Sequence, residues 1–394
     1  MTDPYVKPIE SLLVDPSLFT APYNAGLTSG LVAAAVEPMW ATRPQRQNDR
    51  QEIPVERVDA FFYRRVDEAL SLPKKLRAVA KGLSHIAGLC VLLARVIARK
   101  PDVVHFQWTV VPPVDGIAIA LIRLFRPVVL TVHDTVAFNG ERISWFQNLG
   151  FDWPIRQADR LIVHTRTGRQ TLIDRGVPAE KVAVIPHGPL RLHVTPPTPE
   201  AIAARDARWT FVLFGEIKPY KGLDLLVEAL AMLPAATRRK ARLVVAGRPR
   251  MDMAPIEARI AELGLGSAIE IRARRQSEEE MALLFAQADC FVFPYHQIDA
   301  SGVYFLTKAF SKWMIASRVG IFAEDLREDV DGRLIPVGDV AALAEALGHA
   351  IEARPAGAPP QASDSWTAIG HQTRALYEST MQSRAKRLSP STRT

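Results

Sequence analysis

Several features that mark common classes of protein are missing from this sequence. It has two cysteines in 394 residues, too few for a disulfide framework, and Cys90 and Cys290 each lie in an apolar run typical of a buried thiol in a reducing compartment. No run of about 20 apolar residues is present, so we expect no membrane-spanning helix. The first residues, MTDPYVKPIESLL, lack the basic start and apolar core of a signal peptide, which favours a cytoplasmic protein.

The sequence also lacks the Cys and His spacing of a metal site, so we expect no bound metal. Its size and composition are those of a two-domain globular protein, with 48% hydrophobic and 23% charged residues in 394. The net charge of +7 favours an anionic partner such as a phosphate compound, a membrane surface or a nucleic acid. Because basic and aromatic residues are not interleaved, a nucleic acid is the weakest of the three.

Apolar segments alternate with helical patterns through the first half of the chain. Strands are predicted at 12–14, 58–63, 101–108, 127–135, 158–165 and 181–188, and helices at 31–36, 72–100 and 115–125. This alternation of continuous apolar strands predicts an α/β domain with a parallel sheet covered on both faces. Residues 24–30, NAGLTSG, are predicted as a loop, in which glycine either lets a ligand or backbone come close or makes a simple turn. Residues 40–55 are polar and also predicted as a loop.

A second alternation follows a Pro-rich linker at 191–207. Its strands are predicted at 211–215, 241–247, 268–274, 290–295, 313–317 and 332–337, and its helices at 223–232, 256–263, 278–287, 303–310 and 340–353. The second half is therefore predicted as another doubly wound domain, at 208–360. One more helix is predicted at 361–382, followed by a disordered basic tail at 383–394.

The stretch FVLFGEIKPYKG, residues 211–222, has the residues of an anion site. A buried strand ends at Gly215, a short loop carries Lys218 and Lys221, and an amphipathic helix begins. The free N–H groups of a helix N-terminus and two cations suit a diphosphate, although a solvated loop explains an isolated pair of lysines as well. A second strand–helix junction offers Ser301 and Gly302, and we expect the two junctions to meet around one diphosphate.

Three predicted strands of the first half end in a histidine: His133, His164 and His187. Such a residue is more often structural, but His133 has the best functional prospects because a polar loop follows it. The helix at 72–100 is rich in Lys and Arg. It either packs on a sheet with a basic outer face, which we favour, or lies on anionic lipid.

With these motifs in view, the chain resembles the GT-B glycosyltransferases and is most similar to glycosyltransferase family 4. The matching segments are, in order, DVVHFQW, VVLTVHD, ADRLIVHT, VIPHG, FGEIKPYKGLDLLVEAL, ADCFVFPY with SGV, and DGRLIPVGDVAALAEAL. The likeness is good over residues 100–350 and weak before them. It implies two Rossmann-like domains facing each other across a cleft, an acceptor domain at 1–190 and a nucleotide-sugar donor domain at 208–360.

The resemblance also implies a role for each matching position. The donor diphosphate would be held by Lys218, Lys221, Ser301, Gly302 and Val303. The nucleoside and sugar would lie near Gly215, Gly247, Arg274, Asp299 and Glu324. The catalytic residues would be His133 and Asp134, and the acceptor would lie near Asn24 and Gly26.

Two positions depart from the family pattern. The donor loop of the family carries two glutamates, whereas here the first position falls on or near Asp299 and the second on Leu306 or Thr307. The carboxylate that usually binds the nucleotide ribose is therefore missing. Glu216 stands where many members carry an arginine, and Lys218 substitutes for it.

The implied chemistry is transfer of a hexose from a UDP- or GDP-sugar, which is a substrate and not a cofactor. Because lysines can replace a divalent ion at a diphosphate, we expect no metal. Retention of the anomeric configuration, which the resemblance favours, needs no protein base, whereas inversion would need Asp134 or Glu141.

Two hypotheses about function stay open. The first is an enzyme of polysaccharide or glycolipid biosynthesis with a saccharide or lipid-linked acceptor, located in the cytoplasm and in peripheral contact with anionic membrane. The second is a catalytically degraded partner subunit that keeps the two-domain shell, which the missing glutamate supports.

Overall fold

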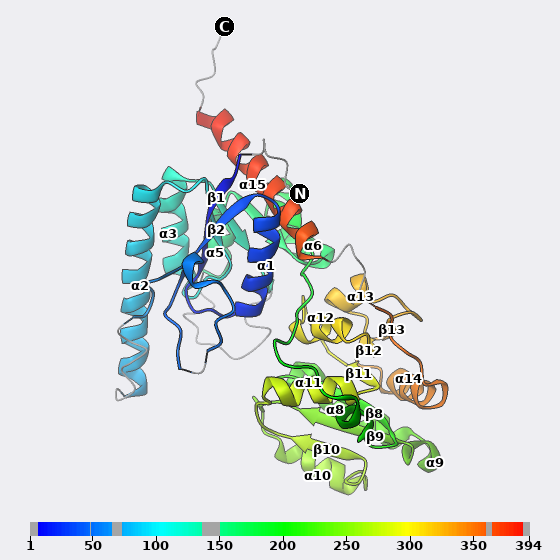
Figure 1. The fold of residues 1–394 in the computed structure, drawn as a ribbon. Helices are drawn as coiled ribbons and strands as arrows, with labels where there is room; N and C mark the ends of the chain where they lie inside the picture. Colours follow the sequence, from blue (N-terminus) through cyan, green and yellow to red (C-terminus); the bar gives the residue numbers. More distant parts are fainter. Residues whose placement is uncertain (1–6, 48, 65–72, 136–149, 360–364, 389–394) are drawn as a thin grey trace. The chain divides into compact units, whose positions relative to one another are not determined.

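The computed structural model describes residues 7–47, 49–64, 73–135, 150–359 and 365–388. The chain forms two compact units, one made of Met1–Gly188 with Ser363–Thr394 and the other of Pro189–Ala362. Each unit has one parallel sheet flanked by helices (Figure 1).

The first unit is built on a seven-stranded parallel sheet in the order β3-β2-β1-β4-β5-β6-β7. Its strands are β1 (Ile9–Asp15), β2 (Val36–Thr42), β3 (Val58–Ala60), β4 (Val103–Phe106), β5 (Val128–Thr131), β6 (Arg160–Val163) and β7 (Val182–Val184). The strand order reverses direction between β1 and β4, and open α/β sheets bind ligands beyond the carboxyl ends of strands at such a point.

Helices cover both faces of this sheet. Leu12 and Val14 of β1 pack on one face, which is covered by α2 (Lys74–Arg99), α3 (Pro112–Phe125) and α5 (Asp152–Gln157). Leu13 packs on the other face, which is covered by α1 (Ala21–Ala33) and α15 (Trp366–Leu388). A further helix, α6 (Arg166–Asp174), follows β6, and short 3-10 turns lie at η1 (Val55–Arg57) and η3 (Ala179–Lys181).

The second unit is built on a six-stranded parallel sheet in the order β10-β9-β8-β11-β12-β13. Its strands are β8 (Trp209–Phe214), β9 (Ala241–Ala246), β10 (Ile269–Arg272), β11 (Cys290–Phe293), β12 (Trp313–Ser317) and β13 (Gly332–Ile335). Its helical segments are α7 (Pro199–Ala203), η4 (Pro219–Lys221), α8 (Leu223–Met232), α9 (Ala235–Arg238), α10 (Ala254–Glu262), α11 (Glu278–Gln287), α12 (Gly302–Ala309), α13 (Gly320–Asp325) and α14 (Val340–Ala353). Here the strand order reverses between β8 and β11, where the sequence analysis placed the diphosphate.

The loop predicted at residues 24–30 is wrong, because those residues lie inside α1. Gly26 and Gly30 are four apart and share one side of the helix, where α15 packs closely. A Cβ atom at Gly30 would lie 2.0 Å from the carbonyl oxygen of Trp366, and one at Gly26 would lie 2.1 Å from the Trp366 ring. Close contact between two helices therefore explains the glycines. In the sequence alone, such glycines look the same as those of a loop.

Two further elements of the first unit differ from prediction. β2 occupies residues that were assigned to the end of a helix and the start of a polar loop. It lies inside the sheet between β1 and β3, so pairing overrides the weak local pattern. At the other end of the chain, α15 continues to Leu388 and includes residues 383–388 of the predicted tail. The Arg384 guanidinium fixes this end by donating to the carbonyl oxygens of Arg123 and Leu124.

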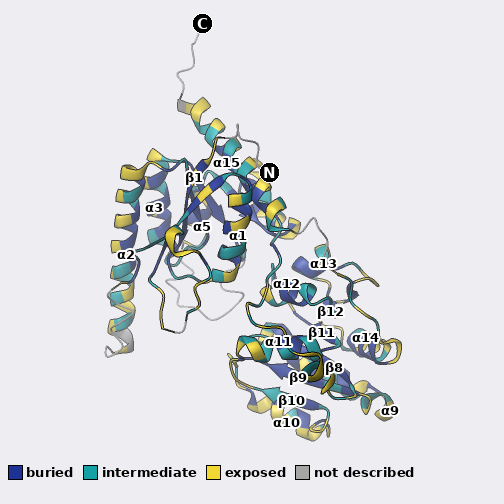
Figure 2. Cartoon of the chain, viewed as in Figure 1, coloured by how far each residue is buried: buried dark blue, intermediate teal, exposed yellow. Residues whose placement is uncertain are grey.

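The outer side of α2 carries apolar residues in contact with solvent (Figure 2). Val79 and Leu83 are 61% and 64% exposed, and Cys90 is exposed too, so the prediction that both cysteines are buried is wrong for Cys90. Cys290 is buried in β11. By length and mean hydropathy, Leu76–Arg99 could cross a membrane. This corrects the expectation that no segment could do so, which rested on the length of apolar runs alone. The core helix of a soluble protein passes the same test.

Candidate active site

Two strand–helix junctions of the second unit meet where the strand order reverses. β8 and β11 are paired neighbours, so the turns that follow them lie side by side. The main-chain N–H of His296 donates to the carbonyl oxygen of Tyr220 at 2.8 Å. Gly222, at the start of α8, approaches β11 so closely that a Cβ there would lie 2.1 Å from the carbonyl oxygen of Pro294.

Lys221 brings a buried cation to this junction. The side chain is 6% exposed, and its Nζ donates to the carbonyl oxygen of Phe214 at 3.0 Å. The same Nζ lies 5.5 Å from the centroid of the Tyr295 ring. Gly215 leaves room for it, because a Cβ at that position would lie 2.9 Å from Nζ and 3.2 Å from Cγ2 of Val303. Lys221 therefore lies between the end of β8 and the start of α12.

Burial and, to a smaller extent, the neighbouring Lys218 lower the pKa of Lys221 to about 7, while Glu216 opposes the shift. Lys218 is itself paired with Glu216, at 3.3 Å between Nζ and Oε2. Glu216 also accepts from Arg250, at 2.6 Å. The site is therefore a cationic group held partly neutral by burial, which an anionic ligand would return to its charged form.

The N-terminus of α12 supplies hydrogen-bond donors beside this lysine. Ser301 is the N-cap residue and is buried, and within the described residues its side chain caps no helix N–H. Tyr295 hydrogen-bonds to the Ser301 side chain. Gly302 and Val303 are the first two helical residues, so their N–H groups have no intrahelical acceptor. A Cβ at Gly302 would have only a side-chain atom of Leu190, at 3.4 Å, within 4 Å of it, so an oxyanion can approach the main chain there.

The other residues predicted to lie near the nucleoside and sugar are spread over several elements of the second unit. Gly247 adjoins Gly215, and a Cβ there would lie 1.9 Å from the Gly215 carbonyl oxygen. Arg274 is committed to a bidentate ion pair with Glu280 at the start of α11. The Asp299 carbonyl oxygen accepts from the Ile321 N–H at 3.0 Å. These contacts give three of the residues structural roles, and a nucleoside or sugar contact for them stays a prediction.

Two other positions of the donor loop were singled out by the resemblance. Glu324 is exposed on α13. Leu306 and Thr307, which stand at the position of the missing glutamate, are both buried, and the Thr307 hydroxyl donates to the Val303 carbonyl oxygen at 2.8 Å. Neither offers a carboxylate to a ribose.

A histidine cluster lies at the carboxyl ends of the strands of the first unit. The rings of His133, His164 and His187 surround Tyr23, at centroid distances of 5.0, 5.5 and 4.8 Å. Trp108 stacks on His133 at 4.7 Å with an interplanar angle of 13°. Trp108 and Tyr23 were not predicted as site residues. Trp108 follows the end of β4 and could have been found as a strand-end aromatic residue, whereas Tyr23 lies in α1 and carries no such signal.

With the His133 and His164 rings both neutral, the hydrogen-bond network sets which nitrogen of His133 carries the proton. Nδ1 of His164 lies 3.0 Å from the carbonyl oxygen of Ile185, which only accepts, so that nitrogen carries the proton. In a neutral ring the His164 Nε2 is then an acceptor, and it receives the Nδ1–H of His133 at 3.1 Å. Nε2 of His133 is left as a lone pair, shielded from solvent and without a partner among the described residues.

Burial holds the pKa of His133 well below its ordinary value, and the neighbouring His164, His187 and His105 add to the shift. The ring is therefore neutral at pH 7 and is suited to accept a hydrogen bond from a hydroxyl, not to hold a proton. Asp134 is half-buried beside it, and Glu141 lies outside the described residues.

The two predicted acceptor residues are helical. Asn24 is fully buried in α1, and its Nδ2 donates to Oδ2 of Asp15 at 2.7 Å. Burial raises the pKa of Asp15, which also accepts from the Phe19 N–H and so fixes the turn from β1 into α1. Gly26 faces Trp366. Contact of these positions with an acceptor stays a prediction.

A pocket with no signal in the sequence opens at the carboxyl ends of β1, β2 and β3. It has a volume of about 300 Å³ and is lined by Leu18, Ala21, Thr42, Arg43, Pro44, Gln45, Arg50, Gln51, Glu52, Ile53, Val55, Val58 and Ala60. It was missed because β2 was missed, so the polar segment after it carried no strand-end signal. Across the described part of the chain, no group of three or more His, Cys, Asp or Glu side chains could hold a metal ion.

Comparison with known families agrees with this architecture. The model for Glycosyltransferase Family 4 matches residues 22–188, and the model for Glycosyl transferases group 1 matches residues 195–361. Between them the two matches include the histidine cluster with Tyr23 and Trp108, and the Lys221 junction.

Sequence relatives are D-inositol 3-phosphate glycosyltransferases. That of Mycobacterium sp. (strain JLS) is 26% identical over 292 residues, 68% of this chain, and that of Mycobacterium tuberculosis (strain F11) is 27% identical over 298 residues, 71% of this chain. The matches span 64% and 58% of those relatives' own lengths.

Solved structures share the fold. Anabaena HepE in complex with UDP and glucose is 18% identical, with a TM-score of 0.64, over 97% of this chain and 99% of that one. Sucrose-phosphate synthase from Thermosynechococcus elongatus is 19% identical, with a TM-score of 0.67, over 95% of this chain and 100% of that one. The chain therefore belongs to the glycosyltransferases of the GT-B fold, with a Family 4 domain followed by a group 1 domain.

Proposed function

We propose that this protein transfers a sugar from a nucleotide-sugar donor to a saccharide or lipid-linked acceptor. The observation that carries the proposal is the position of Lys221, a buried cation between the end of β8 and the N-terminus of α12. Burying an ammonium group costs free energy unless it is compensated. A diphosphate bound at the N–H groups of Gly302 and Val303 would compensate it.

The same groups suit the departure of a nucleoside diphosphate. Charge develops on the leaving phosphate as the glycosidic bond breaks, and fixed cations and N–H donors stabilise that charge. Lys218 and Lys221 supply the cations, so we propose transfer without a divalent metal ion. The solved complexes of HepE contain UDP or UDP-glucose, which favours a UDP-sugar over a GDP-sugar as the donor.

His133 is proposed to hold a hydroxyl of the transferred sugar. Its Nε2 lone pair is buried and lacks a partner among the described residues, which suits acceptance of one hydrogen bond. A ring with so low a pKa is a poor general base. We therefore propose retention of configuration, in which the departing phosphate takes the proton of the acceptor and no protein base is needed.

The acceptor is proposed to enter the pocket at the ends of β1, β2 and β3. Buried Arg43 is fixed there by donating to the carbonyl oxygens of Ser17 and Pro44 and to Asp49. Arg50 also lines the pocket. These cations suit an acceptor with an anionic group, in keeping with the inositol phosphate named for the sequence relatives.

We also propose that α2 rests on an anionic membrane surface, which would place the protein peripherally on the inner face of the cytoplasmic membrane. The helix has no acidic residue, and its exposed side includes Leu76, Val79, Leu83 and Ile86. An apolar face flanked by cations is typical of helices that lie in the interface of anionic lipid.

Calorimetric titration with UDP and GDP, with and without EDTA, tests the donor site. We expect UDP to bind equally well with EDTA and to lose at least tenfold in affinity in Lys221→Met. The control is Lys240→Met, which removes an exposed lysine paired with Glu352. Absence of nucleotide binding, or equal binding in Lys221→Met, would remove the proposal.

A screen of UDP- and GDP-sugars for release of the nucleoside diphosphate tests turnover. Release with at least one sugar supports the transferase. Tight nucleotide binding without release from any sugar would favour the alternative, a catalytically degraded nucleotide-sugar-binding subunit.

A further inference from the structure

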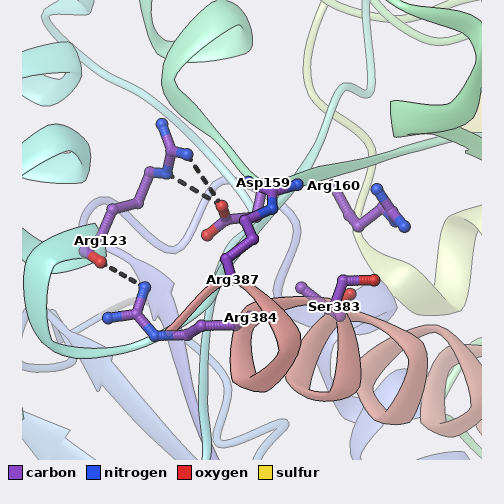
Figure 3. Close-up of a pocket in the computed structure, with 7 residues that line it drawn as sticks. Arg123, Asp159, Arg160, Ser383, Arg384 and Arg387 are labelled. Atoms are coloured by element: carbon purple, nitrogen blue, oxygen red, sulfur yellow. Dashed lines mark hydrogen bonds and ion pairs between the residues drawn. The ribbon is translucent and has the colours of Figure 1, made fainter. Parts of the chain in front are cut away.

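A second cationic site lies in the first unit, where the end of α15 passes the start of β6. Its pocket has a volume of about 190 Å³ and is lined by Arg123, Asp159, Arg160, Thr380, Ser383, Arg384 and Arg387 (Figure 3). Four arginines and one aspartate thus line one pocket. Two segments more than two hundred residues apart in the sequence bring them together.

Two of the four arginines are committed to the fold. Arg123 is paired with Asp159, at 3.0 Å between Nη2 and Oδ1, and the other oxygen of Asp159 accepts the N–H of Val128 at 3.0 Å. Arg384 donates to the carbonyl oxygens of Arg123 and Leu124 at the end of α3 (Figure 3). Cations at a helix C-terminus are stabilised by its dipole, so these two residues need no ligand.

The other two arginines, Arg160 and Arg387, differ. Within the described residues neither has an ion pair or a side-chain hydrogen bond, and the one carboxylate of the pocket is already used. The dipole of α15 accounts for a cation near its own end but not for Arg160, which is the first residue of β6. Like charges without a paired carboxylate repel each other, so the presence of both arginines at one pocket requires another explanation.

The positive charge extends behind the pocket. Lys181 donates to the carbonyl oxygens of Arg156 and Ala158 at 3.2 Å. Its pKa is lowered first by burial and then by Arg123, with smaller contributions from Arg387 and Arg160, while Asp159 opposes the shift. The arginines therefore outweigh Asp159 in their effect on the pKa of Lys181, so the net charge around the lysine is positive.

This pocket is separate from the candidate active site. Arg160 begins β6, and the N–H of Val128, which binds Asp159, begins β5, so the pocket lies at the amino ends of the strands. The histidine cluster lies at the carboxyl ends of the same sheet. Binding here does not compete with a ligand at His133 for space.

The size of the pocket limits what it can hold. Its volume of about 190 Å³ lies below the range of about 300 to 1,000 Å³ typical of pockets for whole drug-sized ligands. One small anionic group fits this description better than a complete nucleotide. Arginine is the usual partner of phosphate, because its planar guanidinium donates two parallel hydrogen bonds to the oxygens of one phosphate group. The hydroxyls of Thr380 and Ser383 donate to carbonyl oxygens of their own helix, which leaves the arginines as the donors.

We propose that Arg160 and Arg387 bind a phosphate group at this pocket, at a site distinct from the one that binds the sugar donor. The phosphate comes either from a soluble phosphate compound or from a lipid headgroup. Leu124, next to Arg123, is 69% exposed, so an apolar surface adjoins the pocket.

The first test uses inorganic phosphate as the probe, titrated by calorimetry into the full-length chain. All proteins carry Lys218→Ala/Lys221→Met, because these substitutions remove the cations of the donor site. Arg160→Gln/Arg387→Gln in that background should weaken phosphate binding at least tenfold. The matched control is Arg239→Gln/Lys386→Gln, which removes two exposed cations outside the pocket and should change binding less than twofold. Thermal unfolding checks that each variant is folded.

The second test distinguishes the source of the phosphate. Flotation with vesicles of phosphatidylglycerol or of phosphatidylcholine compares two proteins. One is the parent chain, and the other is the double variant Arg160→Gln/Arg387→Gln. Binding to phosphatidylglycerol that the double variant loses supports a lipid headgroup, and phosphate binding without such a loss supports a soluble compound. Equal phosphate affinity and equal flotation of the double variant and the control would overturn the proposal. Binding of a polyglutamate peptide at this pocket, with no binding of phosphate, would overturn it in favour of an acidic protein segment.

Discussion

The Nε2 atom of His164 lies 3.1 Å from Nδ1 of His133, and this contact decides which nitrogen of His133 is available to a ligand. His164 is in turn fixed by the carbonyl oxygen of Ile185. A main-chain group at the end of one strand thereby sets the proton position on a ring at the end of another. The result is a neutral histidine with a buried lone pair, positioned by the sheet itself.

His133→Ala should lower kcat by about 10- to 100-fold, which is about 1.4 to 2.7 kcal/mol and is the size of one well-placed hydrogen bond in a dry site. The affinity for UDP should change less than twofold, because UDP lacks the transferred sugar whose hydroxyl would donate to Nε2. Initial rates and UDP calorimetry on the same preparations measure both quantities. A loss of UDP affinity as large as the loss of kcat would contradict the assigned role.

The affinity for UDP should fall as pH rises from about 7 to 9. The free protein has a Lys221 pKa of about 7, and a bound diphosphate raises that pKa, so binding takes up a proton in the interval between the two values. Below pH 7 the lysine is already charged and the dependence should flatten. Calorimetry in buffers of different ionisation enthalpy measures the proton uptake, which Lys221→Met should abolish.

Lys221→Met should also stabilise the fold while it removes donor binding. Because the pKa of Lys221 is lowered from 10.5 to about 7 in the folded state, the unfolded chain binds more protons between those values. Stability from this group therefore rises with pH from about 7 to 10.5, and at pH 7.5 the uncharged variant avoids a cost of about 1 to 3 kcal/mol. Denaturant unfolding at pH 7.5 measures the difference. A variant less stable than the parent would show that the Nζ contact with Phe214 outweighs the burial cost.

Gly30→Ala should destabilise the first unit by about 1 to 3 kcal/mol, since its Cβ would overlap the carbonyl oxygen of Trp366 and push α15 away from α1. Gly82→Ala is the matched control within a helix, because a Cβ there meets nothing within 4 Å. It should stabilise by about 0.5 to 1 kcal/mol through helix propensity. Equal effects of the two substitutions would refute the close helix contact.

Val79→Gln/Leu83→Gln should reduce flotation with phosphatidylglycerol vesicles at least fivefold if α2 rests on the membrane surface. Both side chains are mostly exposed, so stability should change by less than about 0.5 kcal/mol. The control is Val55→Gln, another exposed apolar residue on a different element. Unchanged flotation of the α2 variant would leave α2 as an ordinary surface helix.

The segments that sequence reasoning predicted well are those whose local signals agree with the sheet. α8 and α14 have the predicted bounds, since each follows a buried strand and carries leucine at helical spacing. The meeting of the Lys221 turn with Ser301 followed from strand alternation and the rule for switch points. These two predictions rest on short-range sequence patterns and on one topological rule.

The failures occurred where distant parts of the chain decide the local structure. Gly26 and Gly30 look like a loop until α15, more than three hundred residues later, is placed against them. The tautomer of His133 depends on a carbonyl oxygen fifty-two residues away. Arg160 and Arg387 line one pocket only in the folded unit, so no motif in the sequence could signal it.

The second unit is one uninterrupted stretch of chain, whereas the first is assembled from both ends. During synthesis on the ribosome, residues 189–362 can therefore complete their sheet before α15, which packs on α1, has been made. Because domains fold as units during synthesis, the half of the protein that is made first is the half that matures last. Until residue 366 and its successors emerge, the glycine-lined side of α1 lacks the helix that packs on it, so the packing of α15 completes the first unit.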